Sequence, residues 1–212
     1  MSRCTVVVFD VDGTLMDSAD GIVAGYGHAL RTVGVEPPPE EVLRADLGPP
    51  VGELFAGLGL APDQIEVAVA AYRHYYRETG MGQATVYPGV VDLLDRLAPV
   101  AALGTATAKL TTVAQSFLER YDLRRRFAVV NGTDDTHHTK TETLTRTLEL
   151  LGSPDPARVL MVGDRHIDIS AAHACGVRSV GVLWGYGTAA ELEASSPDHL
   201  IREPDELLSL LG

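Results

Sequence analysis

The chain has 212 residues, of which 45% are hydrophobic and 22% charged, enough apolar side chains for one or two globular domains. Its formal net charge of −12 at pH 7 disfavours nucleic acid and anionic lipid as partners. No apolar run approaches the roughly 18 residues of a membrane span. The two cysteines, Cys4 and Cys175, form no Cys-x-x-Cys motif, which fits a reducing compartment. We therefore expect a cytoplasmic protein that binds neither nucleic acid nor membrane.

Short apolar runs bounded by turn residues have the pattern of buried parallel strands. They are Thr5–Phe9, Val100–Gly104, Phe127–Asn131, Val159–Val162 and Ser179–Leu183. Stretches with apolar residues at helical spacing lie between the later runs. This alternation predicts an α/β fold with a doubly wound parallel sheet, in which ligands bind at the carboxyl ends of the strands.

The first two runs are separated by roughly 90 residues, far more than the dozen or so that a strand-helix-strand crossover needs. Within this interval, residues 22–33 and 65–76 each carry apolar side chains along one helical face. We predict an inserted all-helical cap domain at residues 16–86. Residues 1–15 and 87–212 then form the core domain.

Two carboxylates, Asp10 and Asp12, follow the first predicted strand. Like charges this close at the end of a buried strand repel each other unless a cation joins them. Gly13 lets the backbone approach a ligand closely. The pattern indicates a cation and an anionic ligand at this strand end, although a simple acidic turn shares the shortest part of the signature.

Two further acids, Asp164 and Asp168, stand one helical turn apart after a later strand, and like charges at that spacing again call for a cation. A third charged position of interest is Lys140. Thr139 and Glu142 have capping-box spacing, which places Lys140 in the first turn of a helix, where the helix dipole disfavours it. Something outside the helix should therefore stabilise this lysine.

Phe9-Asp10-Val11-Asp12-Gly13-Thr14-Leu15 and the later motifs resemble the haloacid dehalogenase superfamily of phosphatases, in its phosphoglycolate phosphatase and nucleotidase branch. The resemblance implies that Asp10 attacks phosphorus and forms an aspartyl-phosphate intermediate. It implies that Asp12 is the general acid and base, and that its backbone carbonyl contacts Mg²⁺ together with Asp10. Gly13 would lie against the phosphate, and Lys140 would neutralise Asp10 and the phosphate.

The same resemblance assigns the remaining positions. Asp164 is implied as the third Mg²⁺ contact, and Asp168 as a residue that supports the metal contacts from behind or as a partner of Lys140. Thr107 is implied to bind the phosphoryl oxygens, because Lys109 then falls in register with the family's second motif. Thr105 is the alternative for that role.

The implied function is Mg²⁺-dependent hydrolysis of a small phosphorylated metabolite, in either a phosphoglycolate phosphatase-like or a 5′-nucleotidase-like form. A hexose-phosphate mutase is an alternative, because the same residues would serve if a sugar were rephosphorylated before water entered. An alternative from another class of protein is a phospho-accepting signalling or binding module. Either a monomer or a homodimer is compatible with the sequence.

Three other segments are interpreted more simply. Gly48-Pro49-Pro50 lies where this family's cap carries a substrate-specificity loop, although a helix break has the same composition. Residues 181–187 are rich in glycine, and we assign them no catalytic role. His137-His138 is interpreted as loop.

Overall fold

The computed structural model describes residues 4–134 and 139–212, so the interpretation of His137-His138 lies outside the described residues. The chain divides into two compact units, one formed by residues up to Met16 and by Val86–Gly212, the other by Asp17–Thr85. The chain passes between the units in β2 (Met16–Asp17) and β3 (Thr85–Val86), which pair as a two-stranded sheet.

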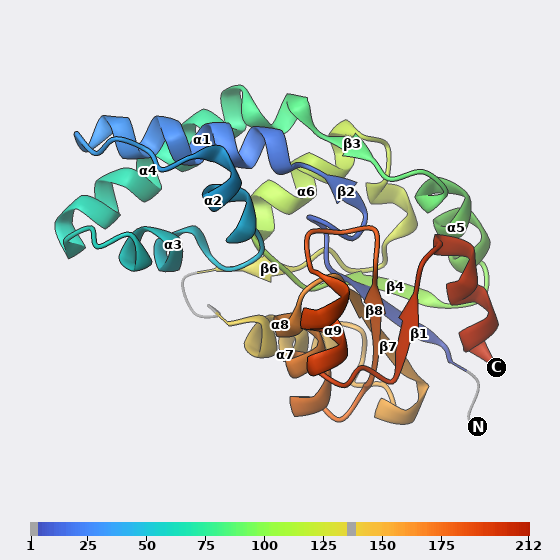
Figure 1. The fold of residues 1–212 in the computed structure, drawn as a ribbon. Coiled ribbons are helices and arrows are strands. Elements are labelled where there is room, and N and C mark those ends of the chain that lie inside the picture. Colours follow the sequence, from blue (N-terminus) through green and yellow to red (C-terminus); the bar gives the residue numbers. More distant parts are fainter. Residues whose placement is uncertain (1–3, 135–138) are drawn as a thin grey trace. The chain divides into compact units, whose positions relative to one another are not determined.

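The first unit is built on a five-stranded sheet in the order β4-β1-β7-β8-β9 (Figure 1). All its neighbouring strands are parallel, which confirms the predicted fold class. Its strands are β1 (Val6–Phe9), β4 (Ala102–Thr105), β7 (Val159–Gly163), β8 (Arg178–Val182) and β9 (His199–Ile201). Because β1 lies between β4 and β7, the chain switches direction across the sheet at β1, and ligands of such sheets bind at that position.

The register of β1 determines which residues meet at the carboxyl edge. Phe9, the last residue of β1, lies opposite Thr105 on β4 and Val162 on β7. All four residues of β1 are buried, as expected for a central parallel strand covered on both faces. The residues that follow these strands, among them Asp10 and Asp164, are therefore brought to one edge of the sheet.

Helices and short strands complete the first unit. The longer helices are α5 (Val90–Leu97), α6 (Thr111–Arg120), α7 (Lys140–Leu150), α8 (His166–Ala174) and α9 (Ala189–Ala194). Short 3₁₀ helices span Arg124–Arg126, Pro156–Arg158 and Pro204–Leu211, and β5 (Thr107–Leu110) pairs with β6 (Gly132–Thr133). Helix α8 packs against α7, β7 and β8, so the start of α8 is held beside the carboxyl edge.

Two details differ from the strands expected from sequence. Residues 127–131 do not form a strand of the sheet; within them, Val129 makes an isolated bridge to Gly104 on β4. At the other edge, β9 has only three residues, too few to show an alternating or continuous apolar pattern. Its pairing with β8 depends on tertiary contacts and not on its own sequence.

The second unit is helical, with α1 (Ala19–Thr32), α2 (Glu40–Ala45), α3 (Val51–Gly57), α4 (Pro62–Glu78) and a 3₁₀ turn over Gly80–Gln83. Helices α1 and α4 pack along their length, and the ring centres of Tyr26 and Tyr72 lie 5.3 Å apart. Gly25 permits this approach, because a Cβ there would lie 2.9 Å from the Tyr72 ring. The buried apolar face of α1 is the one that its sequence spacing predicts.

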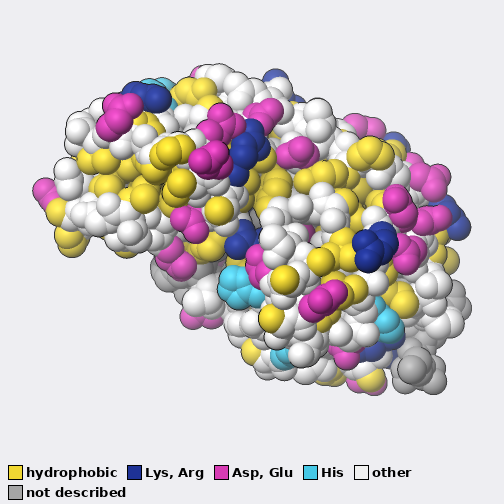
Figure 2. Space-filling view, in the orientation of Figure 1, with side chains coloured by type: hydrophobic (Ala, Val, Ile, Leu, Met, Phe, Trp, Pro, Cys, Tyr) yellow, Lys and Arg dark blue, Asp and Glu magenta, His cyan; other side chains and the backbone are white. Residues whose placement is uncertain are grey.

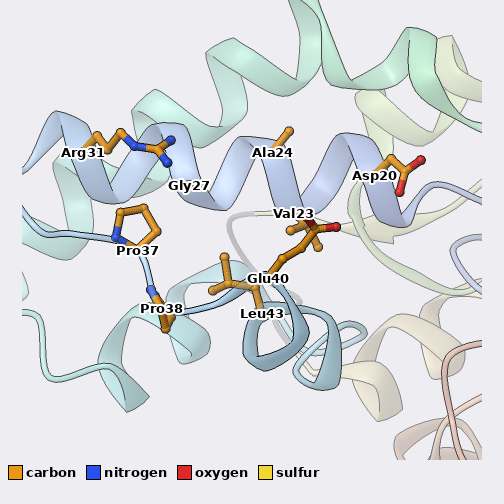
Figure 3. A pocket seen from close by; sticks show the side chains of 9 residues that line it. All are labelled: Asp20, Val23, Ala24, Gly27, Arg31, Pro37, Pro38, Glu40 and Leu43. Atoms are coloured by element: carbon orange, nitrogen blue, oxygen red, sulfur yellow. The ribbon is translucent and has the colours of Figure 1, made fainter.

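A hollow of about 400 Å³ lies within this unit, between α1, the Pro37-Pro38 segment and α2 (Figure 3). Arg31 stands at one end of it and Asp20 at the other. Arg44 of α2 forms ion pairs with both Asp20 and Glu40, which ties α2 to α1.

Acidic side chains are spread over the visible surface and mixed with basic ones, as the net charge leads one to expect (Figure 2). None of the helices in the described part of the chain has the length and apolarity that a membrane crossing requires.

Candidate active site

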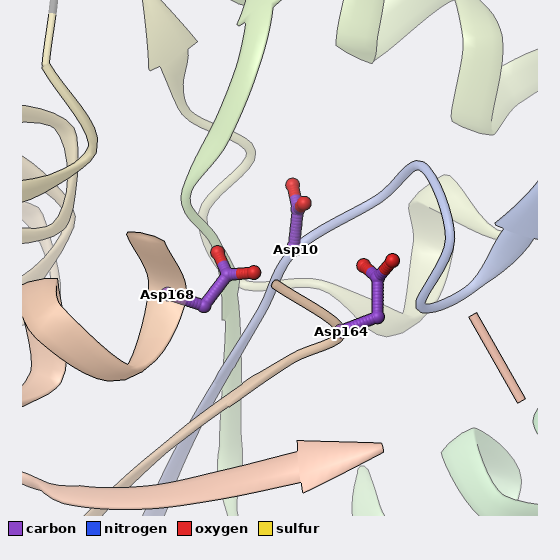
Figure 4. A group of neighbouring side chains, drawn as sticks. All are labelled: Asp10, Asp164 and Asp168. Carbon is purple, nitrogen blue, oxygen red and sulfur yellow. The ribbon is translucent and has the colours of Figure 1, made fainter. Parts of the chain in front are cut away.

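Three buried carboxylates meet at the carboxyl edge of the sheet: Asp10, Asp164 and Asp168 (Figure 4). Each offers an oxygen within 4.8 Å of the others'. Asp10 follows β1, Asp164 follows β7, and Asp168 lies in the first turn of α8. The edge predicted from the strand pattern thus concentrates negative charge in a place with almost no access to water.

The ammonium of Lys140 lies between two of these acids. Its Nζ is 3.0 Å from Asp10 Oδ1 and 2.9 Å from Asp168 Oδ1, and it donates a hydrogen bond to the carbonyl oxygen of Ala106. Thr139 caps α7, and its capping box with Glu142 is present as predicted. The stabilisation that the sequence called for is therefore a pair of buried carboxylates outside the helix.

Asp164 is held by neutral donors. The Thr14 hydroxyl donates to its Oδ1 at 3.0 Å, and the Tyr186 backbone N–H donates to its Oδ2 at 2.8 Å. Gly13, with a φ of 79°, lies so close that a Cβ there would overlap the Asp164 carboxyl group. Both the left-handed backbone and the lack of space require glycine at this position.

Burial changes the protonation of the cluster in the absence of a further cation. Desolvation, with a smaller contribution from neighbouring acids, raises the pKa of Asp10 to about 6, although Lys140 opposes the shift. Desolvation and the charges of Asp168 and Asp10 raise the pKa of Asp164 to about 8. Burial alone would lower the pKa of Lys140, but Asp10 and Asp168 raise it above its ordinary value. The cluster thus contains one ammonium group, that of Lys140, and three carboxyl groups.

Asp12, the second acid of the first motif, is paired separately. Its Oδ2 lies 2.8 Å from Nζ of Lys109, and the two side chains are only 13% and 7% exposed. The Lys109 ammonium also lies 4.9 Å from the centre of the Phe117 ring, within cation–π range. This pairing was not predicted; the only sequence signal for it was the spacing of Lys109 from Thr107.

The two candidate threonines have different partners. The Thr105 hydroxyl donates to the Asn131 carbonyl and accepts from the Asn131 N–H, both at 2.9 Å, so it joins β4 to the neighbouring segment. The Thr107 hydroxyl accepts from the Lys109 N–H at 3.3 Å. Both side chains are buried. The Thr105 hydroxyl thus both donates to and accepts from the backbone, whereas the contact given for Thr107 uses its hydroxyl as an acceptor.

The donor set suits a hard divalent cation. Carboxylate and carbonyl oxygens are the ligands that Mg²⁺ prefers, and Asp164 forms no ion pair with any Lys or Arg within residues 4–134 and 139–212. A cation bound there would favour the charged form of Asp164 and so oppose the effect of burial on its pKa. Both oxygens of Asp168 are engaged within the chain, Oδ1 by Lys140 and Oδ2 by the Arg165 N–H at 3.1 Å. Asp10 is paired with Lys140 through Oδ1 only, and Asp164 receives neutral donors.

Comparisons with known proteins identify relatives along almost the whole chain. A family model described as haloacid dehalogenase-like hydrolase matches residues 7–182. Tyrosine-protein kinase PtkA of Mycobacterium tuberculosis is 35% identical, over 98% of this chain and 72% of that protein. Phosphoglycolate phosphatase of Escherichia coli O157:H7 is 31% identical, over 97% of this chain and 92% of that protein.

A solved structure of the haloacid dehalogenase-like hydrolase SP0104 from Streptococcus pneumoniae matches with a TM-score of 0.93 and 30% identity, and each chain is covered completely. The family model and the 30–35% identical relatives together span nearly all of the described residues. The chain therefore belongs to the haloacid dehalogenase-like hydrolases, the family that its motifs predict.

Proposed function

We propose that this protein is a Mg²⁺-dependent phosphatase that hydrolyses a small phosphate monoester through a phosphorylated Asp10. The observation that carries the proposal is the position of the Lys140 ammonium, 3.0 Å from Oδ1 of the buried Asp10 carboxylate. A carboxylate beside a fixed cation can approach an anionic phosphoryl group, which it would otherwise repel.

In the first step, an oxygen of Asp10 forms a bond to phosphorus while the bond between phosphorus and the ester oxygen breaks. Asp12, in its protonated form, donates a proton to the departing oxygen. In the second step, water attacks the phosphorus of the acyl phosphate, Asp12 accepts a proton from that water, and Asp10 is released as a carboxylate. Covalent catalysis of this kind divides one difficult displacement into two easier ones.

Other residues of the site would bind the phosphoryl group and the metal. The hydroxyl of Thr107, the ammonium of Lys140 and the backbone near Gly13 would contact phosphoryl oxygens. Asp10, Asp164 and the backbone carbonyl of Asp12 would hold Mg²⁺. The ion, when bound, supplies positive charge that offsets the negative charge of the phosphoryl oxygens.

A small phosphorylated metabolite is the substrate class that we propose, in a phosphoglycolate phosphatase-like or 5′-nucleotidase-like reaction. The relative named phosphoglycolate phosphatase, 31% identical over almost the whole chain, supports the first of these. A protein of this kind requires neither nucleic acid nor a membrane, and we propose that it acts in the cytoplasm as a monomer or homodimer.

A second candidate is phosphoryl transfer to a hydroxyl group, since the 35% identical relative is named a tyrosine-protein kinase. The same phosphorylated Asp10 would be attacked by a tyrosine or sugar hydroxyl in place of water, and the latter case is the mutase reaction. A signalling module that stores phosphate is less well supported, because Asp12 stands two residues from Asp10 and can activate water.

The test is an assay of purified protein against a panel of phosphate monoesters and nucleoside phosphates with Mg²⁺, and against a tyrosine-containing protein with ATP. We expect release of inorganic phosphate that EDTA stops and added Mg²⁺ restores. The matched control is Asp10→Asn, which should release none. Transfer to tyrosine or to a sugar without phosphate release would favour the second candidate, and turnover in EDTA would contradict the proposal.

A further inference from the structure

We propose that the loop Trp184–Gly187, which follows β8, is a positioning element for the Asp164 carboxylate and thereby sets the affinity of the site for Mg²⁺. This inference rests on the proposed function. The loop was assigned no role from its sequence, where its glycines indicated only a turn. Its contacts in the structure give it one.

Hydrogen bonds connect the loop to both oxygens of Asp164. The Tyr186 N–H donates to Oδ2 at 2.8 Å, and the hydroxyl of Thr14 donates to Oδ1 at 3.0 Å. The Trp184 indole Nε1 in turn donates to the Thr14 carbonyl oxygen at 3.0 Å. The loop therefore holds one carboxylate oxygen directly and the other through Thr14.

The glycines of the loop are explained by closeness and not by backbone conformation. Neither Gly185 nor Gly187 has a positive φ, so a side chain would be compatible with either backbone. A Cβ at Gly185, however, would lie closer than 3.0 Å to the Asp164 Cβ and to the Gly13 carbonyl oxygen. A Cβ at Gly187 would overlap the Asp164 carbonyl oxygen. Both positions therefore require glycine, because the loop backbone lies directly against Asp164 there.

Both ends of the loop are fixed. One end continues β8, a buried strand of the sheet. The other leads into α9, where Oε1 of Glu191 accepts from Arg165 Nε at 2.8 Å and from the His166 N–H at 3.0 Å. Since Arg165 directly follows Asp164, the helix that ends the loop is bound to the residue next to the carboxylate that the loop holds.

This arrangement has a consequence for metal binding. Two donors fix the orientation of the Asp164 carboxylate beside Asp10, as Figure 4 shows for the carboxylates themselves. Hydrogen bonds to a charged carboxylate also favour the charged form that a metal requires. Loss of such outer partners typically lowers metal affinity by about 10- to 100-fold. Loosening the loop should thus weaken Mg²⁺ binding far more than it slows turnover at saturating Mg²⁺.

The chain offers its own reporter, because Trp184 is its single tryptophan. Mg²⁺ is titrated into the full-length wild type, Gly187→Ala and Gly57→Ala, with binding followed by intrinsic fluorescence and by calorimetry. Gly57 is the matched control, since it lies in α3 without a positive φ and nothing lies within 4 Å of a Cβ placed there. Trp184→Phe, which removes the indole donor but keeps an aromatic ring, is measured by calorimetry.

We expect the Kd for Mg²⁺ to rise about 10- to 100-fold in Gly187→Ala and to rise severalfold in Trp184→Phe, with Gly57→Ala within about twofold of the wild type. The KM for Mg²⁺ should rise in parallel while kcat at saturating Mg²⁺ changes much less. A folded Gly187→Ala with wild-type affinity would overturn the inference. If that variant does not unfold cooperatively, wild-type affinity in Trp184→Phe overturns it. A wild type that binds no Mg²⁺ would instead count against the proposed function.

Discussion

The charged residues of the site are arranged so that each buried charge meets a group of opposite sign or a hydrogen-bond donor. Lys140 joins Asp10 and Asp168, Lys109 joins Asp12, and Asp164 receives two neutral donors. Asp164 is compensated by neutral donors only, and burial raises its pKa to about 8. This imbalance is the physical reason to expect a bound cation.

Asp10→Asn should abolish phosphatase turnover and leave the fold intact. The amide has nearly the shape of the carboxylate but cannot form a bond to phosphorus, and burial already penalises the charge that it removes. Steady-state assays together with thermal unfolding check both parts. Residual turnover above a few per cent of wild type would show that another residue is the nucleophile.

Lys140→Met should lower stability as well as activity. The lysine side chain is only 5% exposed, and its removal leaves Asp10 and Asp168 buried without a cation. Breaking a buried pair in this way costs about 3–5 kcal/mol in the free energy of unfolding. Urea denaturation measures the change, and a double variant Lys140→Met with Asp168→Asn should recover part of the loss. A single variant as stable as wild type would contradict this account.

At the scale of elements, the sequence pattern predicted the strands that matter most for the site. The runs at Thr5–Phe9 and Val159–Val162 are continuous and apolar, and they correspond to β1 and β7, which place Asp10 and Asp164. The segments at the edges of the sheet were harder to predict from sequence. Residues 127–131 make only a bridge and β9 has three residues, because edge pairing depends on neighbours that a local pattern does not contain.

The candidate site, too, could be predicted from sequence only in part. The family motifs named Asp10, Asp12, Lys140 and Asp164 in advance, because each follows a strand or begins a helix with a recognisable cap. They could not show that Lys109 pairs with Asp12, nor that the loop at residues 184–187 rests on Asp164. Those contacts join segments far apart in the chain, and they follow from the strand order and not from spacing.

The segment Gly48-Pro49-Pro50 leads into α3 of the helical unit, with Pro50 at the position before the helix. We expect replacement of residues 48–52 by the corresponding loop of the E. coli phosphoglycolate phosphatase to change relative kcat/KM values across the substrate panel. Mg²⁺ affinity should stay the same, because no Mg²⁺ ligand is altered. An unchanged substrate profile would leave the segment as a simple break between helices.

At the scale of the whole molecule, the acid cluster makes stability depend on pH and metal together. In the metal-free protein the pKa of Asp164 is raised from 3.8 to about 8, and that of Asp10 from 3.8 to about 6. Between about pH 4 and 8 the folded chain then binds more protons than the unfolded chain. Stability contributed by these groups is therefore lost as pH rises through that window.

Chemical denaturation in EDTA from pH 5 to pH 8 measures this effect. We expect the free energy of unfolding to fall towards pH 8, and saturating Mg²⁺ to restore it, since a ligand that binds only the folded state stabilises it. Asp164→Asn should flatten the pH dependence and abolish the response to Mg²⁺. A metal-free wild type that becomes more stable from pH 5 to pH 8 would refute the assigned cause.

The account as a whole depends on a phosphoryl group that resides on one carboxylate during turnover. The most direct measurement is rapid acid quench of the protein with Mg²⁺ and its best substrate, followed by intact mass and peptide mapping. We predict the mass of one added phosphoryl group on the peptide containing Asp10, absent from Asp10→Asn and accumulating in Asp12→Asn. Sustained phosphate release in which Asp10 is never phosphorylated would contradict the central claim.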